Sequence, residues 1–425
     1  MATTSTAISI DTGWQNGQAP HTPQAPPDTW QNHLLRTKGG DIKEAFSNLV
    51  LTLQHTEPWS TASWYDVVRE VPMVGDASLS DQQVAEAALA IGQRYGIAIH
   101  NLKLVQSALV YVCRLHPRDM LQEWLQALPP WDNTSRLTEW LSDLAGAPKT
   151  AYGMAISRLL PVSMVARALH PGCQYRNVVI LEGGEDIGKS KLVKALASPQ
   201  WYREVSHGLE GKEAHMIIQG AWIAELAELS SYGKTEENRL KSFITMENDD
   251  YVPKFSNLTV SRKRRTIFIA TVNPEGDSTY LRGQTGNTRY LPIAVTDIHI
   301  DDVLAVREQL LAEALVYYRE HPADWWQLNP EAATEASTER DQRRQASIYQ
   351  DSLAEWLDGK KKTTWEDIAQ HYLLLEAKEK WKDRALQMDI AKALRALGWW
   401  SHVAKVGKHS VRGWLPPKEE DTVTT

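Results

Sequence analysis

One run of residues has the spacing of a phosphate-binding loop: Gly183-Gly184-Glu185-Asp186-Ile187-Gly188-Lys189-Ser190 fits G-x-x-x-x-G-K-[ST], follows an apolar run and opens a helical segment. Gly183 and Gly188 allow the backbone to turn so that successive amides face phosphate groups, and the helix amino terminus favours an anion. Lys189 would neutralise the β- and γ-phosphates, and the Ser190 hydroxyl would bind magnesium. The sequence therefore predicts that residues 183–191, from Gly183 to Lys191, bind ATP together with Mg2+.

Such a loop also needs an acidic group and a polar group near the phosphates, and both follow later apolar runs. Glu225 ends the run at 222–225, and Glu228 follows one helical turn later. Glu225 would hold the water shell of magnesium or orient the attacking water, and Glu228 either shares that work or is a solvated glutamate. Asn273 ends the apolar run at 266–272, where its amide suits a sensor that places water against the γ-phosphate. A turn-forming asparagine is the alternative.

A basic segment between these motifs has the character of a nucleic-acid contact. Residues 252–255 and 258–260 are predicted to form a hairpin. Lys254, Arg262 and Lys263 are candidates for contacts to the phosphates of a single strand, and Phe255 is a candidate for base stacking. An edge hairpin kept soluble by its basic side chains is the alternative.

The carboxy-terminal segment is basic, although the whole chain is acidic. Residues 360–415 carry twelve Lys and Arg against six Asp and Glu, a net charge of +6, whereas the chain carries −7. The predicted order of helix, helix, helix and two strands describes a winged helix, which can place one helix in the major groove and its wing on the backbone. Lys392 and Arg395 lie on the predicted recognition helix, and Lys408 lies in the wing. This module binds duplex DNA or serves as a protein-protein adaptor.

The elements that must position these residues predict an α/β fold. Apolar runs at 177–181, 221–224, 266–272 and 290–295 alternate with helical segments, which indicates a parallel sheet covered on both faces. The predicted domains are a disordered tail (1–28), a helical amino-terminal domain (29–150), a P-loop ATPase core (151–320), a helical linker (321–350), a winged-helix domain (351–417) and a tail (418–425).

Composition narrows the class of protein. The chain has 425 residues, of which 42% are hydrophobic and 23% charged, as in an ordinary soluble globular protein. The chain has two cysteines, Cys113 and Cys173, so we expect neither a disulfide framework nor a structural zinc site. This low number is typical of a protein of the reducing cytoplasm. No apolar run reaches the roughly 18 residues of a membrane span, and the amino terminus lacks the order of a secretory signal.

Taken together, these motifs resemble the virulence-associated protein E family, a group of superfamily 3 helicase-like ATPases carried by phages, plasmids and genomic islands. The resemblance runs from about residue 131 to residue 356. Besides the phosphate loop, the matching pieces are Trp131-Asp132, Arg136-Leu137, residues 220–229, Lys241-Ser242-Phe243, Thr271-Val272-Asn273, residues 285–292 and residues 307–310.

The resemblance implies a ring-forming ATPase, most often a hexamer, with nucleotide at the subunit interfaces. Arg289 then matches the arginine that reaches the γ-phosphate of the neighbouring subunit. The family commonly has two adjacent arginines where this chain has Thr288-Arg289, and Gly283 replaces a family Asp. Lys241 matches either a contact to nucleotide across the interface or a surface lysine. The hairpin would enter the ring channel and track single-stranded DNA.

We therefore expect a DNA-dependent ATPase, a hexameric superfamily 3-like helicase or translocase that serves replication of a mobile element. It would act with a separate primase or initiator, because the helical region begins almost at the tail. A defence or interference ATPase of a genomic island would use the same motor. Two other classes remain open: a small-molecule kinase with a phosphate loop, and an origin-binding structural protein that does not hydrolyse ATP.

Overall fold

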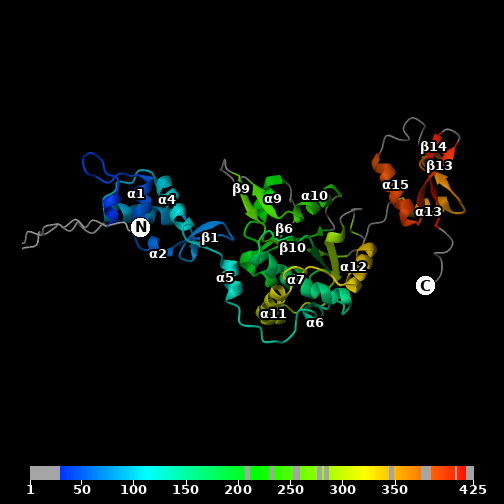
Figure 1. The fold of residues 1–425 in the computed structure, drawn as a ribbon, viewed down its shortest axis with the longest axis horizontal. Coiled ribbons are helices and arrows are strands. Elements are labelled where there is room, and N and C mark those ends of the chain that lie inside the picture. Colours follow the sequence, from blue (N-terminus) through cyan, green and yellow to red (C-terminus); the bar gives the residue numbers. More distant parts are fainter. Residues whose placement is uncertain are drawn as a thin grey trace, which may run out of the picture. The chain divides into compact units, whose positions relative to one another are not determined.

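The computed structural model describes residues 29–205, 211–229, 234–251, 259–274, 280–281, 287–343, 349–374, 384–406 and 409–417. The chain divides into two compact units, Met1–Arg118 and Asp119–Thr425 (Figure 1). Within the described residues, no helix is both long and apolar enough to cross a bilayer.

The first unit combines helices with a small sheet. Its helices are η1 (Trp30–His33), α1 (Phe46–Gln54), α2 (Trp59–Ala62), α3 (Asp81–Tyr95) and α4 (Leu102–Arg114). Ser80 caps α3 through a reciprocal pair of hydrogen bonds with Gln83, and the helix ends at Gly96, whose φ of 67° is left-handed. The sheet has the order β3-β2-β1-β4, with β1 (Ser63–Asp66), β2 (Val71–Val74), β3 (Ala77–Ser78) and β4 (Pro117–Arg118). The sequence missed this sheet because strands of two to four residues carry too short an alternation to recognise.

The second unit is built on a parallel five-stranded sheet of order β11-β5-β10-β7-β6. The strands are β5 (Val178–Glu182), β6 (Tyr202–Val205), β7 (Ile223–Leu226), β10 (Ile267–Val272) and β11 (Tyr290–Ala294). Four of them overlap the predicted apolar runs, and β6 was missed because Tyr202, Arg203 and Glu204 interrupt its apolar character. The prediction of a mixed α/β fold with a parallel sheet is confirmed.

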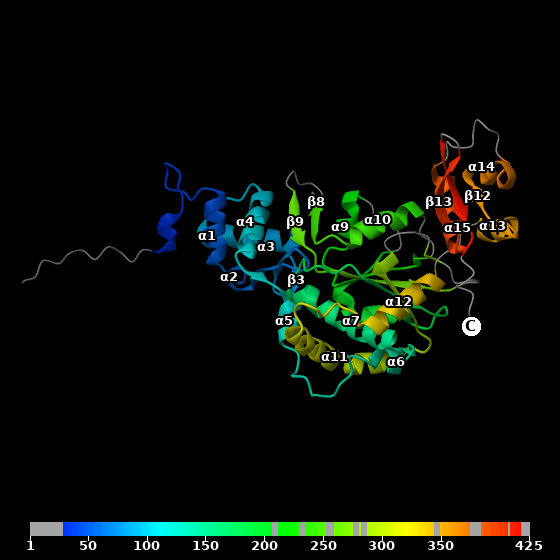
Figure 2. The same cartoon turned by 45° about the vertical axis from the view of Figure 1, so that its right-hand side comes forward.

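Helices cover both faces of this sheet (Figure 2). On one face lie α9 (Gly211–Ile217) and α10 (Lys234–Ile244), which pack against alternate residues of the strands. Helices α7 (Ala151–Leu169), α8 (Lys189–Ala197), α11 (Ile300–Glu320) and α12 (Pro330–Gln342) pack with one another and with the strands on the other side. Helices α5 (Met120–Gln126) and α6 (Trp140–Ala145) pack against α7.

Two of the pieces that carry the family resemblance meet at α11 although 177 residues separate them. The side chain of Gln309 accepts a hydrogen bond from the backbone of Asp132, and Glu313 accepts hydrogen bonds from the backbone amides of Arg136 and Leu137. A salt bridge of 2.7 Å joins Arg136 to Asp132 within the loop. These contacts therefore fix the loop before α6 against α11.

The carboxy-terminal elements have their own core. They are α13 (Gln350–Leu357), β12 (Thr363–Thr364), α14 (Trp365–Asp367), the π-helix η5 (Ile368–Tyr372), α15 (Arg384–Ala396), β13 (Trp400–Val406) and β14 (His409–Leu415), with the sheet order β12-β14-β13. The core contains Leu353, Ile390, Leu394, Trp399 and Trp414. The predicted helix-rich segment ending in a two-stranded hairpin is present.

The predicted domain limits need two corrections. The amino-terminal unit ends at Arg118 rather than at residue 150, because α5 and α6 pack against α7. The helical linker predicted at 321–350 does contain a helix, α12, but this helix packs against α7 and β11 and buries Ala332 and Ala336. Its polar composition hid this packing, because the buried stripe consists of alanines.

Candidate functional site

The glycine-rich loop joins the carboxyl end of β5 to the start of α8. A Cβ atom at Gly183 would lie 2.4 Å from the carbonyl oxygen of Val295, so only glycine fits there. Gly188 has a φ of 97°, in the left-handed region that glycine adopts at little cost, and its carbonyl accepts the first hydrogen bond of α8 from Leu192. Lys189 and Ser190 are therefore the first residues of α8, directly beyond the loop.

The loop lysine and the predicted sensor asparagine lie together. The ammonium of Lys189 donates hydrogen bonds to the carbonyl oxygens of Gly183 (2.8 Å) and Gly184 (2.5 Å) and to Oδ1 of Asn273 (2.7 Å). The side chain of Lys189 is largely buried, and this burial lowers its pKa. Because β10 lies next to β5, the end of β10 carries Asn273 to the loop.

Glu225 is the buried acid of the site. Its carboxylate is fully buried and accepts three hydroxyl hydrogen bonds, from Ser190 (2.6 Å), Tyr202 (2.5 Å) and Thr271 (2.8 Å). Burial and the contact with Glu225 raise the pKa of the Tyr202 phenol, which keeps that group a donor. The structure thus places Glu225 directly beside the second residue of α8.

Two partners of Glu225 were not identified from the sequence. Tyr202 lies on β6, the edge strand that the sequence did not reveal, and no motif marks it. Thr271 did carry a signal, since a hydroxyl two residues before Asn273 in an otherwise apolar strand has to find a partner.

Glu228 has a different setting from Glu225. It lies in the exposed turn after β7, with a φ of 51°. The exposed loop residues Glu185, Asp186 and Lys191 and the half-exposed Ile187 also lie at this end of the sheet. Within the described chain, no group of three or more His, Cys, Asp or Glu side chains has the arrangement of a metal site.

A second buried carboxylate stands directly before the loop. Glu182, the last residue of β5, accepts hydrogen bonds from Nε (2.6 Å) and Nη2 (2.5 Å) of Arg343 and from the hydroxyl of Tyr280. The backbone carbonyl of Arg343 in turn accepts hydrogen bonds from the amides of Tyr280 and Leu281. Although burial opposes it, the contact with Glu182 raises the pKa of Arg343. This pair joins the loop to the segment after Asn273 and to the end of α12.

Arg289 lies at the amino ends of the strands, whereas the loop lies at their carboxyl ends. It ends the short helix η4 (Asn287–Arg289) and precedes Tyr290, which is in register with Val178 at the start of β5. At about 3.3 Å per residue, the loop that begins after Glu182 is about 20 Å from Arg289 along the strand direction. The structure therefore does not bring Arg289 to Lys189 of the same chain. Lys241 is buried and donates a 2.8 Å hydrogen bond to Asn287, so it is not a surface lysine.

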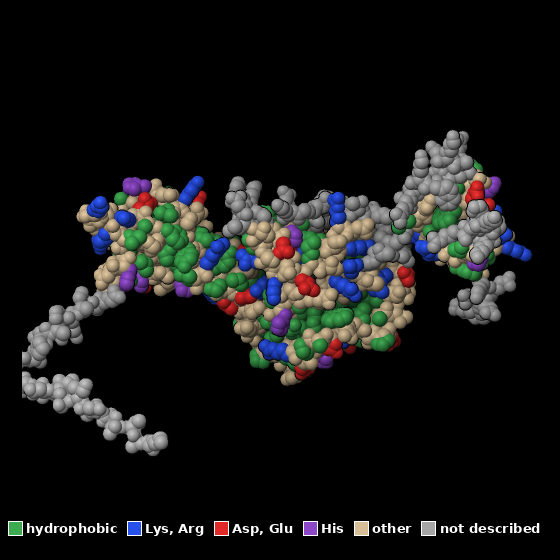
Figure 3. All heavy atoms as spheres, turned by 45° about the horizontal axis from the view of Figure 1, so that its top comes forward, with side chains coloured by type: hydrophobic (Ala, Val, Ile, Leu, Met, Phe, Trp, Pro, Cys, Tyr) green, Lys and Arg blue, Asp and Glu red, His purple; other side chains and the backbone are tan. Residues whose placement is uncertain are grey.

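The hairpin before β10 exists, but its strands differ from those predicted. Strand β8 (Asn248–Tyr251) pairs antiparallel with β9 (Val260–Lys263). The predicted strand at 252–255, with Lys254 and Phe255, lies outside the described residues, as does residue 258, whereas Val260 of the second predicted strand begins β9. Arg262 and Lys263 lie on β9 with exposed side chains. Figure 3 brings this end of the second unit forward and shows lysine and arginine side chains spread over that face.

In the carboxy-terminal segment, α15 carries Lys392 and Arg395. Lys392 is half-buried, and Arg395 is exposed with its guanidinium 5.6 Å from the centre of the Trp414 ring. Lys408 lies outside the described residues. Of two adjacent tryptophans, Trp399 packs in the core of this segment, whereas Trp400 is 43% exposed.

The fold and site define an α/β protein with a glycine-rich loop at the carboxyl edge of a parallel sheet. A sequence model of the virulence-associated protein E-like domain matches residues 125–345, more than half of the chain. The chain belongs to this family, as its motifs indicated.

Among solved structures, those of the NrS-1 C-terminal region are similar to this chain. The A form apo structure is 13% identical, covers 84% of this chain and 96% of its own, and has a TM-score of 0.41. An apo structure of the same region is 12% identical, covers 83% of this chain and 95% of its own, and has a TM-score of 0.42. No curated protein matches the chain.

Proposed function

We propose that the protein is a DNA-dependent ATPase, a P-loop motor of the superfamily 3 type that works as a ring on single-stranded DNA during replication of a mobile element. One observation carries the proposal: Lys189, Ser190, Glu225 and Asn273 come from three separate segments and meet at one edge of the sheet. Membership of the virulence-associated protein E-like family supports the link to mobile elements.

The loop fits the phosphates of ATP. Gly183 leaves no room for a side chain, and Lys189 is partly desolvated with only neutral oxygen partners. An anion at the amino end of α8 would replace these partners and would be favoured by the helix dipole. Lys189 would then neutralise the transferred phosphate, while the Asn273 amide, now 2.7 Å from Lys189, would orient water against it.

The donors present also fit magnesium. Ser190 and Glu225 offer a hydroxyl and a carboxylate 2.6 Å apart, and magnesium typically takes one or two such protein ligands, with water and phosphate oxygens completing the shell. Magnesium bound there would spread the negative charge that develops on the phosphates. We assign Glu225 to this ion because it already contacts Ser190, and leave Glu228 as the exposed candidate for water orientation.

The position of Arg289 supports a ring. An arginine about 20 Å from its own loop can act on a phosphate only when that phosphate belongs to another copy. A homo-oligomer, most simply a hexamer, places the amino edge of one sheet against the carboxyl edge of the next. Such an arginine contributes roughly 10³ to 10⁵ in rate.

Two surfaces would contact DNA. Arg262 and Lys263 lie exposed on one arm of the hairpin and would hold a single strand in the channel. Lys254 and Phe255, which follow β8 in the sequence and lie outside the described residues, remain candidates for the same contact. The carboxy-terminal order of helices and hairpin is that of a winged helix, whose α15 would enter duplex DNA with Lys392 and Arg395. A separate primase or initiator would supply priming.

Lys189→Ala is expected to abolish ATP turnover, because the phosphate charge loses its partner in the loop. Lys194→Ala, on the exposed side of the same helix, is the matched control and should keep full turnover. A phosphate-release assay on both purified variants checks this. Unchanged turnover in Lys189→Ala would remove the ATP site.

Tyr202→Phe removes one of the three hydroxyls that hold Glu225. ATP affinity should stay within about twofold, while turnover should fall by about tenfold, the equivalent of one positioning hydrogen bond. Nucleotide titration together with steady-state kinetics separates the two quantities, and Tyr111→Phe at an exposed position is the control. Equal turnover in Tyr202→Phe and the control would show that Glu225 needs no orientation from β6.

Arg289→Ala should retain ATP binding and lose hydrolysis. Mixing it with Lys189→Ala should restore part of the activity, because an interface formed by the intact Lys189 of one subunit and the intact Arg289 of the other is complete. Turnover measured across a series of mixing ratios, with native mass spectrometry to verify mixed rings, tests this. Verified mixed rings without any recovery would contradict an arginine acting between subunits.

Charge reversal at Lys392 and Arg395 should weaken duplex binding while single-strand-stimulated ATPase activity persists. Each lost phosphate contact should flatten the log–log salt dependence of duplex binding by roughly 0.9. Fluorescence anisotropy over a salt series measures this, with Lys103→Glu on α4 as the control and thermal unfolding as the check of folding. An unchanged affinity and slope would mark the segment as a protein adaptor.

A further inference from the structure

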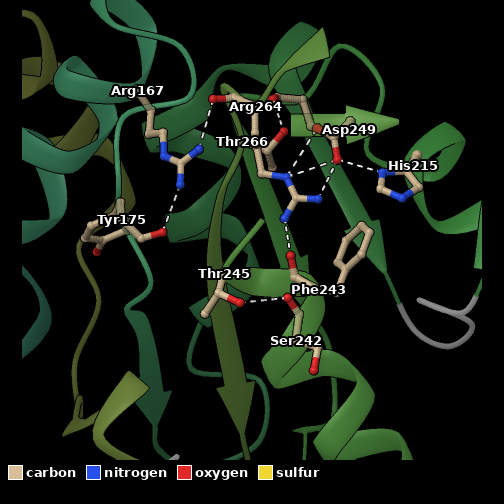
Figure 4. A network of polar contacts seen from close by, with 10 residues as sticks. Arg167, Tyr175, His215, Ser242, Phe243, Thr245, Asp249, Arg264 and Thr266 are labelled. Atoms are coloured by element: carbon tan, nitrogen blue, oxygen red, sulfur yellow. Dashed lines mark hydrogen bonds and ion pairs between the residues drawn. The ribbon is translucent and has the colours of Figure 1, made fainter. Parts of the chain in front are cut away.

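The base of the hairpin is fixed by a buried arginine. Arg264 directly follows β9 and is 1% exposed. Its Nε donates to both oxygens of Asp249 on β8 (3.1 and 3.2 Å), its Nη2 also bonds Asp249, and its Nη1 bonds the carbonyl oxygen of Phe243 on α10 (Figure 4). The arginine therefore ties both arms of the hairpin to the last turn of α10.

The same residue is held by the backbone and by two further elements. Its amide donates to the carbonyl of Glu247 (2.8 Å), and its carbonyl accepts hydrogen bonds from the amide of Gly172 (2.8 Å) and from Arg167 on α7 (3.0 Å). Asp249 also contacts Nδ1 of His215 on α9 at 2.7 Å. Because these partners enclose the hairpin base, a shift of the base would act on α9 and α10 and on its contact with α7.

The last turn of α10 also holds the segment that carries Arg289. Lys241, two residues before Phe243, donates its 2.8 Å hydrogen bond to Asn287, the first residue of η4. Its ammonium also lies 5.5 Å from the centre of the Tyr290 ring. Arg264 precedes β10 and η4 precedes β11, so the two attachments lie at the same edge of the sheet.

We propose that Lys241 and Arg264 are positioning residues that couple the DNA-contacting hairpin to Arg289 through the last turn of α10. A strand bound on the hairpin would move its base, Arg264 would carry that movement to α10, and Lys241 would set the position of η4. Closely packed interiors transmit such shifts as rigid displacements. This inference rests on the proposed function, because it gives the hairpin and Arg289 the roles described above.

The test uses the full-length protein and ATP turnover with and without a poly-dT oligonucleotide. Lys241→Met keeps the length of the side chain and loses the hydrogen bond to Asn287. We expect its basal turnover and its poly-dT affinity to stay within about threefold of wild type, while the stimulation by poly-dT falls at least fivefold. Lys241→Arg should restore at least half of the stimulation, and Lys194→Met on α8 should behave as wild type.

A second variant removes the same hydrogen bond from its other end. Asn287→Ala should lose stimulation to the same extent as Lys241→Met, and the double variant should lose no more, since both changes act on one contact. Independent, additive losses would overturn the coupling. If Lys241→Met folds poorly, Asn287→Ala alone still tests the contact, and full stimulation in that variant would overturn the coupling.

The outcomes separate the two proposals. If poly-dT stimulates the ATP turnover of Lys241→Met as fully as that of wild type, the coupling is overturned and the proposed ATPase activity is unaffected. Absence of stimulation in wild type overturns both. Loss of stimulation in Lys241→Met with recovery in Lys241→Arg supports the coupling, because a merely structural lysine would lower basal turnover in the same proportion.

Discussion

The buried carboxylate of Glu225 is the group on which the candidate site depends. A carboxylate removed from water is costly unless hydrogen bonds replace its hydration. Here Ser190, Tyr202 and Thr271 supply those bonds from α8, β6 and β10. Since each donor belongs to a different element, satisfying one charge fixes the start of α8 against three neighbouring strands. The same constraint sets Lys189 and Asn273 within reach of each other.

The parallel sheet places two groups of candidate functional residues at opposite ends of its strands. The loop and Asn273 follow the carboxyl ends of β5 and β10, and Glu225 lies near the carboxyl end of β7. The hairpin and η4 precede the amino ends of β10 and β11. In the function proposed above, one copy cannot complete its own phosphate site with Arg289, and the proposed nucleic-acid contacts lie away from the phosphates. The proposed assembly of copies and the proposed link across the fold both rest on this arrangement.

The sequence was most informative where chemistry requires a fixed spacing. The glycine loop and the four apolar strands could be located, because each depends on neighbouring residues. Arg343 and Glu182 are 161 residues apart, and nothing local marks either as a partner of the other. The second strand of the hairpin was placed too early for a related reason: β9 consists of Val-Ser-Arg-Lys, whose exposed polar residues lack apolar alternation.

Buried arginine–carboxylate pairs stand where irregular segments join the sheet at both edges. Arg343 and Glu182 fix the chain beside the loop, and Arg264 and Asp249 fix the base of the hairpin. Such pairs contribute little net stability compared with apolar packing, since desolvation offsets most of their attraction, but removal of one member leaves a buried charge. Their consequence is geometric: each arginine has several donors in a fixed plane and can hold separate segments at once. The described residues at these junctions are thereby fixed to the sheet, as the proposed relay of movement between its two ends would require.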